Sequence, residues 1–291
     1  MVENLSSSNT GIVKVGQFEI EAPHGHIYHS ENLPDTYDYV PWNVIAATIN
    51  EANIDNVHLI DVGANVGDSL AHFRRFSDAP VTCVEASKHF FGFLERNARQ
   101  FGNVNLINKL VAPKNLFGKL HFSSGDQTGS TDIAAHPNLA WSGEHIALEQ
   151  LLNDSKMNYI FKTDTDGFDL QIVRACLDAS IENSSNVPII FFEGPNADLL
   201  QSGDLENWFR LFTSLQVAGY GLLFLTNSGF PYCYAGRDKS AARSALQSLS
   251  LGYKRGRAVC HYFDIIAIAD DLHSVTARLQ QTWGDEIFAR V

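Results

Sequence analysis

The stretch Leu59-Ile-Asp-Val-Gly-Ala-Asn-Val-Gly-Asp68 joins an apolar, β-branched run to a pattern typical of a helix. The run predicts a buried strand, and residues 67–76 predict a helix because apolar side chains recur there at helical spacing. Gly63 and Gly67 would let a ligand and the following helix approach the backbone closely. Asp61, at the carboxyl end of the strand, can accept hydrogen bonds from ammonium or hydroxyl groups. We therefore expect a ligand-binding loop at this point.

The loop differs from a dinucleotide-binding fingerprint, which would have a glycine where Asn65 stands. Without that glycine a pyrophosphate cannot approach the backbone tightly, and an acidic residue in the loop repels phosphates. An uncharged or cationic adenosyl ligand suits the loop better. An NAD-dependent oxidoreductase is therefore a disfavoured alternative.

Strand and helix patterns alternate along the chain after residue 57. This alternation predicts parallel βαβ units and a sheet covered by helices on both faces. The predicted strands are 57–62, 81–84, 104–111, 118–123, 159–162, 187–192, 221–225 and 262–268, and the predicted helices are 67–76, one after an N-cap at Ser87, 168–177 and 204–218.

The N-terminal part of the chain has a different pattern. Residues 11–29 predict a β-hairpin, and residues 41–52 predict a helix with a proline in its first turn. We interpret residues 1–55 as a cap on one α/β domain that spans residues 56–291. Residues 226–261 form a long, aromatic-rich connection, which predicts a lid or substrate wall. A contact within a homodimer is the alternative for that segment.

The composition excludes several classes of function. The chain has 291 residues and a formal charge of −12, which argues against nucleic acid or an anionic membrane as the main partner. No apolar run has the ~18 residues that a membrane helix requires. The four cysteines show no CxxC pairing and the N-terminus lacks a signal-peptide pattern. We expect a cytoplasmic protein with reduced thiols.

Further acidic residues follow other predicted strands. Glu85 ends the second strand, 24 residues after Asp61, where a carboxylate can take both hydroxyls of a ribose. The alternative for Glu85 is a capping or salt-bridged residue. Lys162-Thr-Asp-Thr-Asp-Gly167 follows the strand at 159–162, and Glu193 ends the strand at 187–192. Because the carboxyl ends of parallel strands share one edge, we expect these residues near one crevice.

Together these segments resemble the FkbM family of S-adenosylmethionine-dependent methyltransferases. The resemblance covers roughly residues 57–195 and is carried by Asp61-Val-Gly-Ala-Asn-Val-Gly67, Val84-Glu85, Ile160-Phe-Lys-Thr-Asp-Thr-Asp-Gly167 and Ile190-Phe-Phe-Glu193. It implies a class I methyltransferase fold, Rossmann-like, with seven mostly parallel strands and a final antiparallel strand at 262–268. It also implies methylation of a hydroxyl on a sugar, a polyketide or another small secondary metabolite. N- or C-methylation, or non-catalytic binding of the adenosyl cofactor, are the alternatives.

The resemblance also assigns the cofactor site. It implies that the loop and its neighbours hold S-adenosyl-L-methionine, with Glu85 on the ribose and Ala86 against the adenine. The cofactor-binding residues so implied are Asp61, Gly63, Ala64, Asn65, Gly67, Glu85, Ala86, Ser130 and Thr131. For Ser130 and Thr131 an ordinary polar turn is the alternative.

The catalytic candidates are Asp164, Glu193 and His145. Asp164 is expected nearest the transferred methyl group, where it would accept the hydroxyl proton, position the hydroxyl or bind a divalent cation. A capping role or a salt bridge to Lys162 is the structural alternative for Glu193. His145 is an alternative general base. A magnesium ion among these carboxylates is an option that the residues do not favour.

Histidines are also concentrated near the N-terminus, in the segment His24-Gly-His26-Ile-Tyr-His29. Their spacing on a hairpin does not favour a zinc site. We expect one of them, with Tyr28, Tyr37 or Tyr39, to line the substrate mouth.

Overall fold

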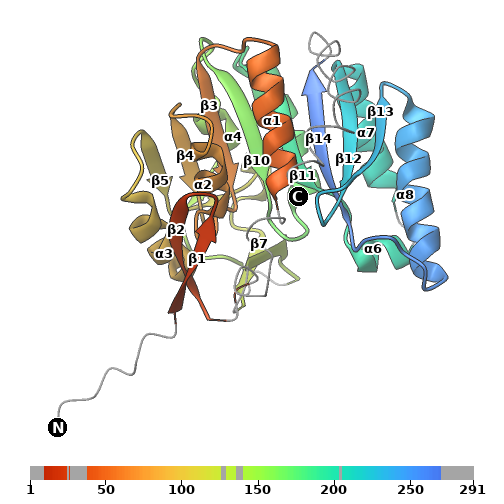
Figure 1. The fold of residues 1–291 in the computed structure, drawn as a ribbon. Helices are drawn as coiled ribbons and strands as arrows, with labels where there is room; N and C mark the ends of the chain where they lie inside the picture. The colour runs from red at the N-terminus through yellow and green to blue at the C-terminus, as the bar shows by residue number, and fades with distance from the viewer. Residues whose placement is uncertain are drawn as a thin grey trace.

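A computed structural model describes residues 10–24, 26, 38–125, 129–135, 140–202 and 205–269. Within these residues, eight strands form one central sheet in the order β13-β12-β14-β11-β10-β3-β4-β5 (Figure 1). The strands are β3 (Val57–Val62), β4 (Val81–Val84), β5 (Val104–Ile107), β10 (Asn158–Thr163), β11 (Asn186–Glu193), β12 (Tyr220–Thr226), β13 (Pro231–Gly236) and β14 (Phe263–Ala269).

The sheet is mixed and mostly parallel. Strands β5, β4, β3, β10 and β11 run parallel to one another, whereas β14 lies antiparallel between β11 and β12. The predicted α/β fold with a final antiparallel strand is therefore confirmed. The sheet has one strand more than the predicted seven, because β13 pairs antiparallel with β12 at the outer edge.

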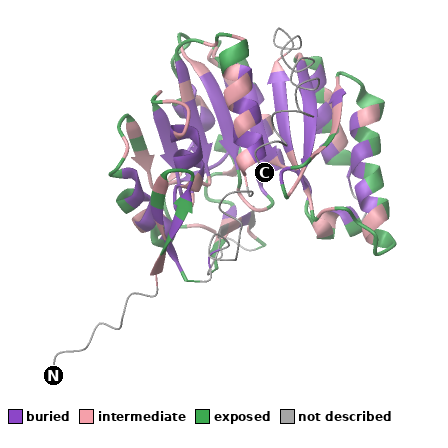
Figure 2. Cartoon of the chain, in the orientation of Figure 1, coloured by how far each residue is buried: buried purple, intermediate pink, exposed green. Residues whose placement is uncertain are grey.

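Helices cover both faces of the sheet. The first face packs α1, α2 and α3 against strand residues such as Leu59 and Ile160, and the second packs α4, α5, α7 and α8 against Ile60 and Phe161. This alternation follows from the two-residue period of a strand. Figure 2 shows the central strands almost entirely buried. The helices are α1 (Tyr39–Glu51), α2 (Asp68–Arg74), α3 (Lys88–Ala98), α4 (Leu148–Leu151), α5 (Asp169–Glu182), α6 (Ala197–Ser202), α7 (Glu206–Val217) and α8 (Lys239–Lys254).

The N-terminal hairpin packs beside α2 and α3. It consists of β1 (Thr10–Val15) and β2 (Phe18–Pro23), which form a small core with Phe90 and Phe93 of α3. Asn97 ties α3 to the hairpin, because its side chain accepts from the Glu21 N–H and donates to the Glu21 carbonyl, both at 2.8 Å. The predicted hairpin and helix are confirmed, and the domain boundary at residue 55 stays a prediction.

The predicted strand at 104–111 is wrong as one strand. It divides into β5 and β6 (Leu110–Val111), and β6 pairs with β9 (His145–Ile146) in a separate ladder. The interruption has a physical cause at Asn108, whose side chain donates to the carbonyls of Glu85 and Ala86 at 2.7 and 3.2 Å. The strand predicted at 118–123 also leaves the central sheet, since β7 (Leu120–Ser124) pairs with β8 (Gly129–Ile133).

The long connection predicted at 226–261 contains regular structure. It forms β13 and the 16-residue helix α8, and α8 begins where the Asp238 carboxylate accepts from the N–H groups of Ser240 and Ala241. In Figure 1 this helix stands at the end of the sheet beyond β13. A large part of the predicted insertion therefore extends the sheet and its helical cover.

The structure bears on two expectations from the sequence, reduced thiols and the lack of a membrane helix. The four cysteines are free thiols, and Cys83 and Cys176 are buried. Among the described residues, no helix combines the length and apolar character that crossing a bilayer demands.

Candidate functional site

A cavity of about 230 Å³ lies at the carboxyl ends of β3, β4, β10 and β11. Strands β4 and β10 flank β3, and the chain leaves β3 toward β4 and returns later to β10 on its other side. The loops after β3 and β10 therefore diverge at a topological switch point, where ligands bind in open α/β sheets. Sheet order thus brings together the residues that end these four strands.

Gly63 allows two of these loops to touch. Its φ of +76° lies in the left-handed region, and a Cβ atom placed on it would lie 1.9 Å from the carbonyl oxygen of Asp164. Glycine is therefore required for the contact between the β3 and β10 loops, in addition to any approach of a ligand. The contact sets the position of the Asp164 backbone relative to the first loop.

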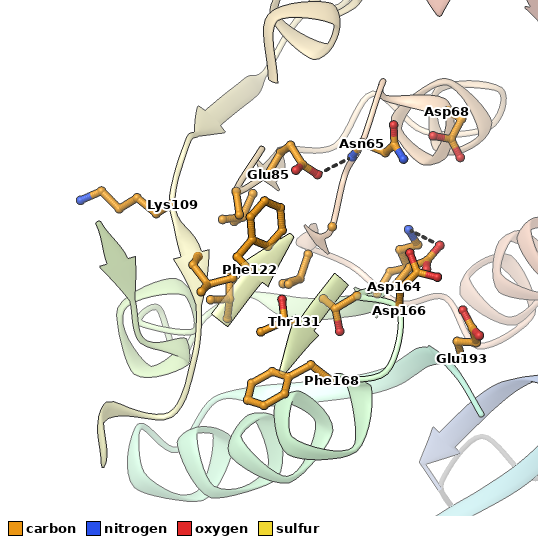
Figure 3. A pocket seen from close by; sticks show the side chains of 18 of the residues that line it. Asn65, Asp68, Glu85, Lys109, Phe122, Thr131, Asp164, Asp166, Phe168 and Glu193 are labelled. Carbon is orange, nitrogen blue, oxygen red and sulfur yellow. Dashed lines mark hydrogen bonds and ion pairs between the residues drawn. The ribbon is translucent and has the colours of Figure 1, made fainter. Parts of the chain in front are cut away.

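Glu85 is held by backbone hydrogen bonds at the end of β4. One carboxylate oxygen accepts from the Asn65 N–H at 2.9 Å (Figure 3). The other accepts from the Ser87 N–H at 2.7 Å. Burial raises the pKa of Glu85 to about 7, although these two hydrogen bonds oppose the shift. Each oxygen keeps acceptor capacity for a further donor. Asn65 supplies its N–H from a left-handed conformation with φ of +46°.

Asp61 and Lys162 form a buried ion pair on neighbouring strands. Lys162 Nζ lies 3.3 Å from Asp61 Oδ1 and 3.5 Å from Asp164 Oδ2, and Asp61 is 0% exposed. Burial raises the pKa of the Asp61 carboxyl to about 6 despite the lysine. Burial lowers the pKa of Lys162, but Asp61 and Asp164 more than offset it, so the pKa stands well above its usual value. The lysine therefore stays cationic beneath Asp164.

Carboxylates dominate one side of the cavity. Figure 3 shows Asp164, Asp166 and Glu193 on this side, and Phe122 and Glu85 on the other. Burial raises the pKa of Glu193 well above its usual value, and the neighbouring charges of Asp164, Asp166 and Asp169 act in the same direction. Apart from Glu85, the opposite side is apolar and includes Val84, Ala86, Leu110, Val111 and Phe122. The cavity therefore has one apolar end and one acidic end.

The loop between β10 and α5 presents the acidic residues. Asp169 begins α5, and its carboxylate accepts from the Thr163 hydroxyl at 2.8 Å and the Thr165 N–H at 3.2 Å. Burial raises the pKa of Asp169 to about 7. Asp166 adopts a left-handed φ of +48°, which is uncommon for a residue other than glycine. Asp169 therefore holds the loop, whereas Asp164 and Asp166 line the cavity.

The structure brings seven of the twelve predicted site residues to the cavity wall. These are Gly63, Asn65, Glu85, Ala86, Thr131, Asp164 and Glu193. A salt bridge between Glu193 and Lys162 was a structural alternative for Glu193. Among the described residues, Lys162 instead pairs with Asp61 and Asp164. The roles assigned to these residues stay predictions.

The other five predicted residues lie outside the cavity wall. Asp61 and Ala64 are buried behind it, and Gly67 is the N-cap of α2. Ser130 donates its hydroxyl to the carbonyl of Asp166 at 3.1 Å, so it supports the acidic loop. His145 lies on β9, where its ring stacks on Phe117 at 5.0 Å.

Of the N-terminal histidines, His26 lines the cavity, and the expected role of one of them at a substrate mouth stays a prediction. Its Nε2 lies 3.3 Å from Asn65 Oδ1, which links the segment after the hairpin to the first loop. His29, Tyr28 and Tyr37 lie outside the described residues.

Sequence reasoning missed several residues of the wall. Asp68 is adjacent to Gly67 in the first motif, and Tyr262 precedes β14, so both had a positional signal. Asp38 had no such positional signal. It is the N-cap residue of α1, far from the motifs in sequence, and only the tertiary fold brings it to the cavity. The aromatic residues Phe230 and Tyr232 are not part of the wall, so the described cavity gives no support to a lid at 226–261.

The carboxylates are spread along the wall. In the part of the chain that the structure describes, no three His, Cys, Asp or Glu side chains are close enough together to hold one metal ion.

Comparisons with known proteins concern the fold. No protein-family model matches the chain, and no curated protein matches it. Similar solved structures include the SAM-dependent methyltransferase from Agrobacterium tumefaciens, with 11% identity over 91% of this chain and 71% of that chain and a TM-score of 0.42. They also include TYW2 from M. jannaschii in complex with AdoMet, with 8% identity over 91% of this chain and 87% of that chain and a TM-score of 0.43.

Proposed function

We propose that the chain is an S-adenosylmethionine-dependent methyltransferase that methylates a hydroxyl oxygen of a small molecule. The observation that carries the proposal is the position of Glu85, which presents a backbone-held carboxylate to the cavity beside an apolar wall at the switch point of the sheet. The resemblance of the four motifs to the FkbM family supports the same activity.

The cavity fits an adenosyl cofactor on its own chemistry. Glu85 keeps acceptor capacity for two ribose hydroxyls, and Ala86, Leu110 and Phe122 offer an apolar surface for a purine. Asn65 and Asp68, at the first loop and the first turn of α2, would hold the methionine end. A site lined by carboxylates also suits a ligand that carries a cationic sulfonium.

The chemistry requires an aligned acceptor and a proton acceptor. S-adenosylmethionine, when bound, supplies an electrophilic methyl group on a sulfonium sulfur. A hydroxyl oxygen that takes this methyl group must lose its proton, and the sulfur keeps the electron pair of the broken bond. Asp164 is the carboxylate proposed to accept the proton. Two contacts fix the position of Asp164: the ion pair of its carboxylate with Lys162 and the close approach of its backbone carbonyl to Gly63.

Two measurements test this proposal. Isothermal titration should show binding of S-adenosylmethionine and S-adenosylhomocysteine and no comparable binding of NAD. Binding of NAD alone would contradict the proposal.

Incubation with methyl-labelled S-adenosylmethionine and fractionated small metabolites should yield a labelled ether, as a mass-spectrometric product. The Asp164→Asn variant should bind the cofactor within about twofold of the unchanged chain and lose roughly 100-fold or more of the methylation rate. A labelled amine or carbon product would favour the N- or C-methylation alternative. Cofactor binding without any product would favour a non-catalytic binding protein.

A further inference from the structure

The loop after β3 is contacted from the N-terminal part of the chain by His26. This residue is 4% exposed, and its ring packs edge-on against Phe90 of α3, with the ring centroids 6.5 Å apart. Its backbone N–H donates to the carbonyl of Pro23, at the end of β2, at 3.0 Å. The end of the hairpin and α3 therefore fix the imidazole in one orientation at the cavity wall.

The contact of His26 with Asn65 determines how the Asn65 amide is turned. His26 Nε2 lies 3.3 Å from Asn65 Oδ1, and both residues line the cavity. An amide oxygen only accepts hydrogen bonds, so this contact requires a proton on Nε2. With its oxygen held by His26, Asn65 has its amide nitrogen, a donor with two hydrogens, as the end that can meet a ligand.

The methionine end of the cofactor needs such a donor. It carries one ammonium and one carboxylate, and an acidic wall residue such as Asp68 suits only the ammonium. Of the two lysines in the wall, Lys162 is engaged in the buried ion pairs described above. Lys109 pairs with Glu144 at 2.7 Å, and Figure 3 shows its side chain pointing away from the cavity. A neutral amide donor can hold the carboxylate without a further cation.

We propose that His26 is a positioning residue for the cofactor. By donating to Asn65 Oδ1 it turns Asn65 Nδ2 toward the carboxylate of the methionine end. The inference rests on the proposed function and gives the N-terminal part of the chain a role in cofactor recognition. The opposite tautomer of His26 would hold the amide nitrogen and leave Asn65 to offer an oxygen, which suits the ammonium instead.

The test compares two ligands that differ only in the carboxylate. They are S-adenosylhomocysteine and 5′-deoxy-5′-(3-aminopropylthio)adenosine, and their affinities for the full chain are measured by isothermal titration at pH 8. We expect the unchanged protein to prefer S-adenosylhomocysteine by about tenfold or more, and His26→Phe to lose about tenfold of this preference. His26→Gln should keep most of it, because the glutamine amide can donate in place of Nε2.

A purely structural role of His26 would give a different result. It would weaken both ligands equally and leave the preference unchanged, and that outcome would overturn the inference. Asn65→Ala should lose the preference as well, and adding His26→Phe to it should cause no further loss. A further loss of preference in the double variant would show that His26 does not act through Asn65.

His89→Phe is the matched control. His89 contacts the same Phe90 ring at 5.2 Å, but it lies on the exposed side of α3 and outside the cavity wall, so the preference should not change. If His26→Phe does not fold, long-range ¹H–¹⁵N NMR of the unchanged protein with S-adenosylhomocysteine decides, and an unprotonated Nε2 on His26 would overturn the inference. Failure to bind S-adenosylhomocysteine at all would overturn the proposed function and this inference together.

Discussion

Replacing Lys162 with methionine tests the buried ion pair most directly. Methionine has a similar length and no charge, so the change removes the ammonium that lies 3.3 Å from Asp61 and 3.5 Å from Asp164. Asp61 is 0% exposed, and among the described residues Lys162 is its ion-pair partner. Removing one partner of a buried ion pair costs about 3–5 kcal/mol. We expect a loss of that size in the free energy of unfolding at pH 8, measured by urea denaturation.

The loss should depend on pH. Burial already raises the pKa of Asp61 from 3.8 to about 6, a shift worth about 3 kcal/mol. A carboxyl whose folded-state pKa is raised destabilises the fold at pH values above that pKa. The destabilisation disappears as the pH falls toward the pKa that the carboxyl has in the unfolded chain. Without Lys162 the pKa of Asp61 should rise further. The difference between Lys162→Met and the unchanged protein should therefore be smaller at pH 5 than at pH 8.

Two comparisons decide whether the reasoning holds. The double variant Asp61→Asn/Lys162→Met removes both charges and should recover about 1–3 kcal/mol relative to Lys162→Met. Lys109→Met is the control, because Lys109 pairs with Glu144 at the surface, and it should cost less than about 1 kcal/mol. A loss below about 1 kcal/mol in Lys162→Met, or no recovery in the double variant, would refute the reasoning.

The remaining predictions concern the loops and the cofactor. Gly118 has a φ of +70° and open space around it, so Gly118→Ala should cost about 1–2 kcal/mol in chemical denaturation. Gly63→Ala adds a clash with the Asp164 carbonyl, so its free energy of unfolding should fall by at least about 1–3 kcal/mol more than that of Gly118→Ala. Equal losses of stability in the two variants would contradict the close contact. Because burial holds the pKa of Glu85 at about 7, its ionised form is lost below that pH. The affinity for S-adenosylhomocysteine in calorimetry should therefore fall about tenfold per unit below pH 7, and Glu85→Gln should bind more weakly without this dependence.

The sheet and the edge that carries the site could be predicted because local patterns determine them. Near-continuous apolar runs mark the buried strands, and the residues that end those runs include Asp61, Glu85 and Glu193. Parallel strands place their carboxyl ends at one edge, so no long-range information was needed to group these residues. The cap at Ser87 was equally local, and its hydroxyl accepts from the Phe90 N–H.

Other features depend on contacts that no local pattern encodes. Whether Lys162 pairs with Asp61 or Glu193 depends on which strands are neighbours and on their register. His145 follows a segment that leaves the sheet, so its distance from the cavity could not be read from its position in the chain.

Helix α8, in contrast, did have a local signal that the sequence analysis did not use. Asp238 is a capping residue, and Ala242, Ala245, Leu246 and Leu249 recur at helical spacing.

Strand β13, which the sequence did not predict, also affects the tendency of the sheet to aggregate with other chains. An unpaired strand edge is a template for aggregation, and β12 would present such an edge with the apolar run Tyr220–Thr226. Strand β13 covers it, begins with Pro231 and pairs with register shifts at two points, which makes it a poor template itself. The opposite edge, β5, is only four residues long. An internal deletion of residues 231–236 should therefore give β-rich aggregates during expression, while the unchanged chain remains dispersed.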